Sequence, residues 1–165
     1  MNSKKLTWGI FALYFLSLTW IILFKFQLSF QNLPQLRNIN LIPFGGSTII
    51  NGTIDFSEII WNALAFIPFG VLLCVLTQRK SFVKMITPIF LTSLFYETIQ
   101  YVFAIGGSDI TDIIANTLGG IIGIGIFFIL LKAFKEKTHN IVNIVSLIAA
   151  ILLIVSIALL FLANV

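Results

Sequence analysis

The sequence predicts an all-α integral membrane protein folded as one helical bundle, and two features support this prediction. Hydrophobic residues make up 59% of the 165-residue chain, whereas charged residues make up only 10%. A water-soluble domain of this size would need much more polar surface to cover its core. The apolar residues also form five long runs, and their connections are too short to fold separately. We therefore expect a single domain over residues 1–165.

Each apolar run is long enough to cross a bilayer as a helix. About 20 apolar residues span roughly 30 Å of hydrocarbon at the helical rise of about 1.5 Å per residue. The runs that qualify cover residues 6–24, 59–77, 85–103, 113–131 and 141–162. The first run follows Lys4 and Lys5, as the apolar region of a signal peptide would, but it is long for that role. We therefore expect it to be an uncleaved first span.

The positions of the basic residues predict the orientation, because short cytoplasmic loops accumulate Lys and Arg. Eight of the ten basic residues lie before the first run, between the second and third, or between the fourth and fifth: Lys4 and Lys5; Arg79, Lys80 and Lys84; Lys132, Lys135 and Lys137. We expect this side, with the N-terminus, to be cytoplasmic, and the C-terminus to be extracytoplasmic. The net charge of +4 then reflects topology. It does not indicate nucleic-acid binding, which would require a clustered basic surface with readout elements.

Polar residues interrupt three of the runs, and the predicted topology brings them to the extracytoplasmic side. They are Asn62 near the start of the second run, Glu97 and Gln100 near the end of the third, and Asp109, Asp112 and Asn116 around the start of the fourth. An isolated ionisable group in hydrocarbon costs about 2.5 to 3.5 kcal/mol on insertion scales, so such residues usually face a bundle interior and mark a functional site. We therefore expect an outward-facing polar pocket.

Glu97 lies about 9 Å below the outer boundary of the third span, as judged from the helical rise. Gln100, three residues later, shares its helix face. The outer half of each run lacks Lys and Arg. We expect Glu97 to be hydrogen-bonded by Gln100, Asn62 or Asn116, or to carry a proton because of desolvation. A salt bridge would require Lys25 or Arg37 to fold inward.

Some of these polar residues also have simple structural interpretations. Asp55 and Glu58 have the spacing of a capping box at the start of the second span. Asp109, with Asp112 three residues later, can cap the fourth helix. Capping does not explain Asn116, which lies inside the apolar run. For Asn62, ordinary helix packing through a polar contact and participation in a site are equal alternatives.

Three further features concern helix geometry and metal chemistry. Pro68 predicts a kink in the second span, because proline cannot donate a helical hydrogen bond. Gly119, Gly120 and Gly123 predict a small-residue surface for close helix approach. Cys74 and His139 are the only residues of their types, which excludes an intramolecular disulfide and makes a histidine-based zinc site or catalytic triad unexpected.

Four ordered motifs resemble those of VanZ-like membrane proteins. They are NLIPF at residues 40–44, NALAFIPFG at 62–70, ETIQ at 97–100 and DITDIIANTLGG at 109–120. The resemblance covers nearly the whole chain, including the number and order of the spans. Many VanZ-like proteins place a basic residue just before the first aspartate, where this chain has Gly106, Gly107 and Ser108. The resemblance implies low-level resistance to the glycopeptide teicoplanin in a Gram-positive bacterium, by a mechanism that does not rebuild the peptidoglycan terminus.

Three functions from different classes are compatible with these residues. The first is a non-catalytic membrane factor that binds teicoplanin or a lipid-linked cell-wall precursor at the outer leaflet, or another membrane lipid. The second is an enzyme acting on an envelope lipid, with Glu97 and Asp112 as acid and base, or with Asp109 and Asp112 as metal ligands. The third is an accessory subunit of a transporter, although five spans without an internal repeat fit most transporters poorly. We expect no cofactor and no nucleic-acid partner, and the sequence does not define an oligomeric state. The candidate ligand-binding residues are Asn40, Asn62, Glu97, Gln100, Asp109, Asp112 and Asn116.

Overall fold

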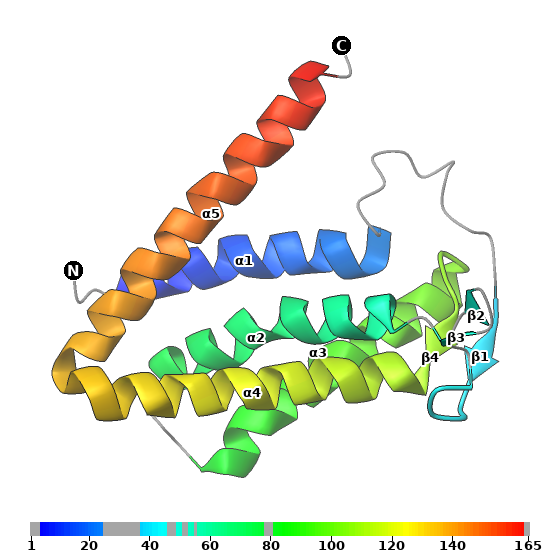
Figure 1. Cartoon of the computed structure of the whole chain (residues 1–165), viewed down its shortest axis with the longest axis horizontal. Coiled ribbons are helices and arrows are strands. Elements are labelled where there is room, and N and C mark those ends of the chain that lie inside the picture. The colour runs from blue at the N-terminus through cyan, green and yellow to red at the C-terminus, as the bar shows by residue number, and fades with distance from the viewer. Residues whose placement is uncertain are drawn as a thin grey trace.

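The protein is all-helical, as the sequence predicts (Figure 1). The computed structural model describes residues 4–24, 37–45, 49–50, 53–54, 56–77 and 81–163. Its α-helices are α1 (Lys4–Phe24), α2 (Ser57–Thr77), α3 (Phe82–Phe103), α4 (Ile110–Phe134) and α5 (Thr138–Ala163), with a short 3-10 helix, η2 (Lys135–Lys137), between the last two. Each predicted run therefore falls within a helix.

Within the described residues, four helical stretches are long and apolar enough to cross a membrane. They are Lys4–Phe24, Ser57–Thr77, Phe82–Phe103 and Ile110–Leu152. The fourth stretch contains α4 together with the first part of α5, so the expected count of five separate spans is not confirmed. The class of protein is nevertheless the expected one, because these stretches have the length and composition of membrane spans.

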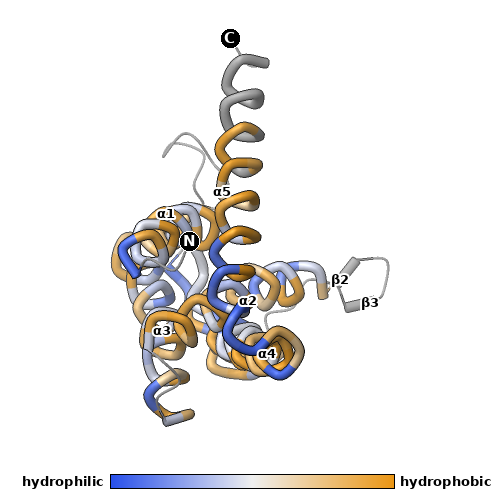
Figure 2. The backbone as a smooth tube through the Cα atoms, turned by 90° about the vertical axis from the view of Figure 1, so that its left-hand side faces the viewer, coloured by the Kyte–Doolittle hydropathy of each residue, from blue (hydrophilic) through white to orange (hydrophobic). Residues whose placement is uncertain are grey.

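Helix α5 separates from the rest of the bundle (Figure 1). Near its start, the Thr7 hydroxyl of α1 donates to Asn143 Oδ1 at 3.0 Å, and Val142 is buried. Beyond this point Val145 and Ile148 are exposed, and α5 is apolar along most of the described part that leaves the bundle (Figure 2). A helix that is apolar all round can be covered by lipid as well as by protein.

Helices α2 and α4 form the closest contact in the bundle, because glycines let their backbones approach. A methyl group at Gly119 would collide with the carbonyl of Ala63, and one at Gly123 would collide with the carbonyl of Ile67. Gly70 of α2 meets α4 in the same way. The predicted small-residue surface is therefore confirmed. Helix α2 continues through Pro68 without interruption.

Short strands join the connections at one end of the bundle. Strand β1 (Ile39–Asn40) pairs in parallel with β4 (Ser108–Asp109), which lies between α3 and α4. Strand β2 (Ile49–Ile50) pairs with β3 (Thr53–Ile54) in antiparallel fashion. Figure 1 shows these strands at the end opposite to the start of α1, the end of α2 and the turn from α4 into α5. The described basic residues Lys4, Lys5, Lys84, Lys132, Lys135 and Lys137 therefore lie toward one end, and β1 and β4 lie at the other.

Candidate functional site

Asp109 connects three parts of the chain at the strand-bearing end. Its side-chain Oδ1 accepts the backbone N–H of Thr111 at 2.7 Å, which caps the N-terminus of α4 as predicted. Its Oδ2 accepts the side-chain amide of Asn40 at 3.0 Å. Its own backbone N–H donates to Glu97 Oε2 at 2.7 Å. The segment around β1, the end of α3 and the start of α4 are therefore held at one residue.

Asn40 and Thr111 also position the turn after β1. Asn40 Oδ1 accepts the backbone N–H of Ile42 at 3.1 Å, and the N–H of Gly45 donates to the carbonyl of Ile42 at 2.9 Å. The N–H of Phe44 donates to Thr111 Oγ1 at 2.9 Å, and Phe44 has a positive φ of 63°. The backbone therefore bends sharply around Pro43, and a side-chain hydrogen bond ties this bend to α4.

A pocket of about 350 Å³ lies beside this junction, among the helix ends that are nearest to the strands. Its polar lining combines two carboxylates, from Glu58 of α2 and Asp112 of α4, with two amides, from Asn62 of α2 and Gln100 of α3. Apolar walls complete it: Ile21, Ile22 and Trp61. Apolar walls with a few convergent polar groups are typical of ligand sites.

Gln100, one of the lining residues, has an unused hydrogen-bond acceptor. Its Nε2 donates to the backbone carbonyl of Ile22 at 3.2 Å, which leaves Oε1 as the free end of the amide. Gln100 is only 2% exposed, and its Oε1 lacks a hydrogen-bond partner in the described part of the protein. An unsatisfied buried acceptor costs about 1–3 kcal/mol, so it indicates a group that a donor would complete.

Glu97 lies one helical turn below Gln100 and is also 2% exposed. Its second oxygen, Oε1, lacks a partner among the described residues. The carboxylates of Asp109 and Asp112 are near enough to interact with it electrostatically. Glu97 is therefore bonded by a backbone N–H that the sequence did not suggest, instead of by the expected amides of Asn62, Gln100 or Asn116.

Buried polar groups continue below the pocket along α3 and α4. Asn116 is fully buried, and its Nδ2 donates to the hydroxyl of Ser93 at 2.9 Å. Asn116 Oδ1 has no partner in the described part of the chain. Ser93, Glu97 and Gln100 follow one another at helical spacing, so they form a polar column along α3, and Ser93 meets α4 through Asn116.

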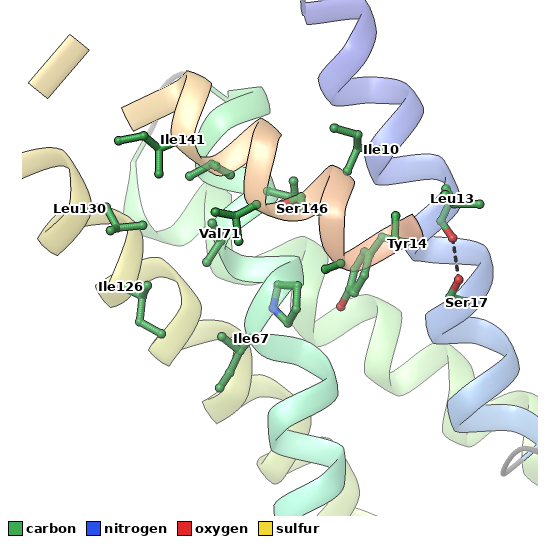
Figure 3. Close-up of a pocket in the computed structure, with 16 residues that line it drawn as sticks. Ile10, Leu13, Tyr14, Ser17, Ile67, Val71, Ile126, Leu130, Ile141 and Ser146 are labelled. Atoms are coloured by element: carbon green, nitrogen blue, oxygen red, sulfur yellow. Dashed lines mark hydrogen bonds between the residues drawn. The ribbon is translucent and has the colours of Figure 1, made fainter. Parts of the chain in front are cut away.

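A second cavity, of about 420 Å³, lies closer to the basic end and is predominantly apolar (Figure 3). Its walls come from α1, α2, α4 and α5, as Ile10, Ile67, Leu130 and Ile141 illustrate. The hydroxyl of Ser17, one of its few polar groups, donates to the carbonyl of Leu13 at 3.0 Å. None of the seven predicted ligand-binding residues lines this cavity.

The structure brings the seven predicted residues to one region, at three different depths. Asn62, Gln100 and Asp112 line the polar pocket. Asn40, Glu97 and Asp109 form the hydrogen-bonded junction beside it. Asn116 lies deeper, against Ser93.

Sequence reasoning missed Glu58 and Ser93 as members of this region. Glu58 lines the pocket, whereas its expected role was that of a capping residue, and the proposed partner Asp55 lies outside the described residues. Each missed residue lies four positions before a predicted one, Glu58 before Asn62 and Ser93 before Glu97. Helical spacing could therefore have identified both.

The structure bears on two arrangements considered from the sequence, a salt bridge to Glu97 and a metal site at Asp109 and Asp112. Arg37 does not fold onto Glu97, because its guanidinium lies over the ring of Tyr101 and donates to the carbonyl of Val102 at 3.2 Å. Lys25 lies outside the described residues. Among the residues that are described, no group of three or more His, Cys, Asp or Glu side chains is placed to hold a metal ion. Both oxygens of Asp109 accept protein hydrogen bonds.

Comparison with known proteins agrees with the motifs and the helical architecture. The VanZ/LLP1 family model matches residues 11–132. The chain is 38% identical to Protein VanZ of Enterococcus faecium over 157 residues, which is 93% of each chain. No solved structure shows significant similarity to this fold. A match of this extent, over the helices that carry both the pocket and the junction, shows that the chain belongs to the VanZ/LLP1 family.

Proposed function

We propose that this protein lowers the susceptibility of a Gram-positive bacterium to teicoplanin by binding a ligand in the polar pocket. The ligand is the antibiotic or a lipid-linked cell-wall precursor at the outer leaflet. One observation carries the proposal: Glu58, Asn62, Gln100 and Asp112 converge from three helices on one pocket, at the end away from the basic connections. If those basic connections are cytoplasmic, the pocket faces the cell wall.

The architecture around the pocket supports binding in preference to simple structural packing. A hydrogen-bonded junction positions the ends of α3 and α4 through Glu97 and Asp109. A close glycine contact fixes α2 against α4. The pocket residues thus project from rigid elements, and a preorganised site loses less entropy when it binds a ligand. The volume of about 350 Å³ suits part of a large ligand, such as a head group.

Susceptibility measurements test the proposal directly. In a Gram-positive host that produces the protein, Asn62→Leu and Asp112→Asn should return the inhibitory concentration of teicoplanin to that of cells without it. Glu136→Gln, in η2 at the basic end, is a matched control that removes a carboxylate and should leave protection intact. Immunoblots of membranes check that all variants accumulate equally. Full protection by both pocket variants at normal protein levels would refute the proposal.

The pair Glu97 and Asp112 favours one alternative, an enzyme acting on an envelope lipid. Two carboxylates in different environments can serve as general acid and general base. Here Glu97 is buried while Asp112 lines the pocket, and the two interact electrostatically. Mass spectrometry of envelope lipids incubated with purified protein distinguishes the alternatives. An enzyme would yield a modified lipid that Glu97→Gln abolishes, whereas a binding factor would return its ligand unchanged.

A further inference from the structure

The polar pocket is rich in hydrogen-bond acceptors, and this property bears on the kind of ligand it can accept. Its polar lining residues are two carboxylates and two amides, and none of the described lining residues is basic. Gln100 contributes an acceptor as well, because its Nε2 donates to the carbonyl of Ile22 and this bond holds the amide group in place. Its Oε1 is buried and lacks a partner among the described residues.

The same excess of acceptors continues behind the pocket wall. Glu97 Oε1 and Asn116 Oδ1 are both buried and both lack a partner in the described part of the chain. Buried acceptors are normally satisfied, and only a donor can satisfy them. The side chains of Asp109 and Asp112 also lie within electrostatic interaction distance of Glu97, so acidic residues gather around the pocket.

We propose that the pocket selects ligands that present a primary ammonium group. An ammonium carries three N–H donors and a positive charge, which complements both the Gln100 acceptor and the carboxylates of Glu58 and Asp112. A quaternary ammonium has the charge but lacks N–H donors. An anionic head group has the wrong charge for this lining. The inference rests on the proposed binding function of the pocket and specifies the chemistry of its ligand.

Trp61 provides a direct probe, because its side chain belongs to the pocket lining. In a background carrying Trp8→Phe and Trp20→Phe, the fluorescence of Trp61 reports lipids whose acyl chains carry bromine quenchers. The full chain is reconstituted in nanodiscs of phosphatidylglycerol containing brominated phosphatidylethanolamine, phosphatidylcholine or phosphatidylglycerol. Phosphatidylethanolamine should bind more tightly than either other lipid by about tenfold, the effect of one charge-assisted hydrogen bond.

A soluble amine is the second source of the same chemistry. Calorimetric titration of the protein with teicoplanin and with N-acetylated teicoplanin, in nanodiscs free of phosphatidylethanolamine, separates an antibiotic amine from a lipid amine. Selectivity for the amine in either experiment supports the proposal and identifies the source. Equal binding of the three lipids, together with equal binding of the two forms of the antibiotic, overturns it. A preference for phosphatidylglycerol overturns it as well.

Variants connect the selectivity to the pocket. Gln100→Leu and Asp112→Asn should each reduce the amine preference about tenfold. Asn140→Leu is the matched control for Gln100, because Asn140 Oδ1 is likewise buried and lacks a described partner, but Asn140 lies near the start of α5. The relative affinities of these ligands are measured on the unaltered protein. The proposal can therefore be refuted even if a pocket variant fails to fold. The pocket could prefer amines while cells with the pocket variants keep the same teicoplanin susceptibility as cells with the unaltered protein. That combination would refute only the resistance function.

Discussion

At the scale of single residues, Glu97 shows how one carboxylate can serve both the fold and the site. It is buried in the bundle, yet one oxygen accepts the backbone N–H of Asp109, which begins the cap of α4. That hydrogen bond orients the start of α4 relative to the end of α3. The other oxygen lacks a described partner. The residue is thus held by its structural role while part of its bonding capacity stays available.

This arrangement predicts a contrast between two replacements of Glu97. Glu97→Gln keeps an acceptor for the Asp109 N–H and should change the free energy of unfolding little. Glu97→Ala leaves that N–H unsatisfied and should lower the free energy of unfolding by about 1–3 kcal/mol. Thermal unfolding in detergent, followed by circular dichroism, measures the difference, and hydrogen exchange at the Asp109 amide localises it. Glu136→Ala, on an exposed residue, is the control. Equal stability of the two Glu97 variants would contradict this account.

At the scale of elements, the contact between α2 and α4 is the one that glycine makes possible. Transmembrane helices gain little from the hydrophobic effect when they associate, so they rely on close packing. Gly119 and Gly123 place the α4 backbone directly against carbonyls of α2. Asn62 lies directly before Ala63 in this contact, and Asp112 lies about two helical turns before Gly119 on α4, so the contact fixes the two helices that carry these pocket residues.

A single added methyl group tests this contact. Gly119→Ala would place Cβ against the carbonyl of Ala63, and overpacking of this kind costs about 1–3 kcal/mol. Gly125→Ala makes the same change on the same helix where nothing lies within 4 Å. There the substitution should be neutral or favourable by up to about 1 kcal/mol, because alanine is the better helix former. Thermal unfolding of both variants in one detergent makes the comparison. Equal unfolding temperatures for the two variants would show that α2 and α4 are not packed as closely as described.

At the scale of the whole molecule, the two ends of the bundle differ in charge. Lys4, Lys5, Lys132 and Lys135 lie at the end where α1 starts and where α4 turns into α5, whereas the pocket and the β1–β4 pair lie at the other. The distribution of basic residues predicts that the first end is cytoplasmic. The proposed function depends on this orientation, because teicoplanin and exported cell-wall precursors are met outside the cell.

Cysteine labelling tests the orientation in intact cells. The buried Cys74 is first replaced by alanine, and single cysteines are then introduced as Gly107→Cys at the pocket end or Ser81→Cys at the basic end. Both positions are exposed. A membrane-impermeant maleimide should label the cysteine at position 107 in whole cells, and the one at position 81 only after permeabilisation. The reverse pattern would place the pocket in the cytoplasm and exclude a direct encounter with external antibiotic.

The sequence by itself determined the class of protein, the helices and most of the residues that gather at the candidate site. Long apolar runs have few alternatives in a bilayer, because a spanning segment must satisfy its own backbone hydrogen bonds. Polar residues within such runs are costly in free energy. The positions of Asn62, Glu97, Gln100 and Asn116 inside apolar runs therefore identified them as candidate site residues. The cap at Asp109 and the glycine surface of α4 were equally visible, since both depend on local spacing.

Only the tertiary structure decided which of these residues line the pocket and which hold the surrounding segments together. It joined Asn40 to Asp109 through a parallel strand pair that links segments 69 positions apart. It placed Glu58 in the pocket and Glu97 behind its wall, and it separated α5 from the bundle. The physical reason is that local spacing defines which face of a helix a residue occupies, whereas neighbouring helices define what that face meets. Contacts between distant segments depend on packing, which no short stretch of sequence contains.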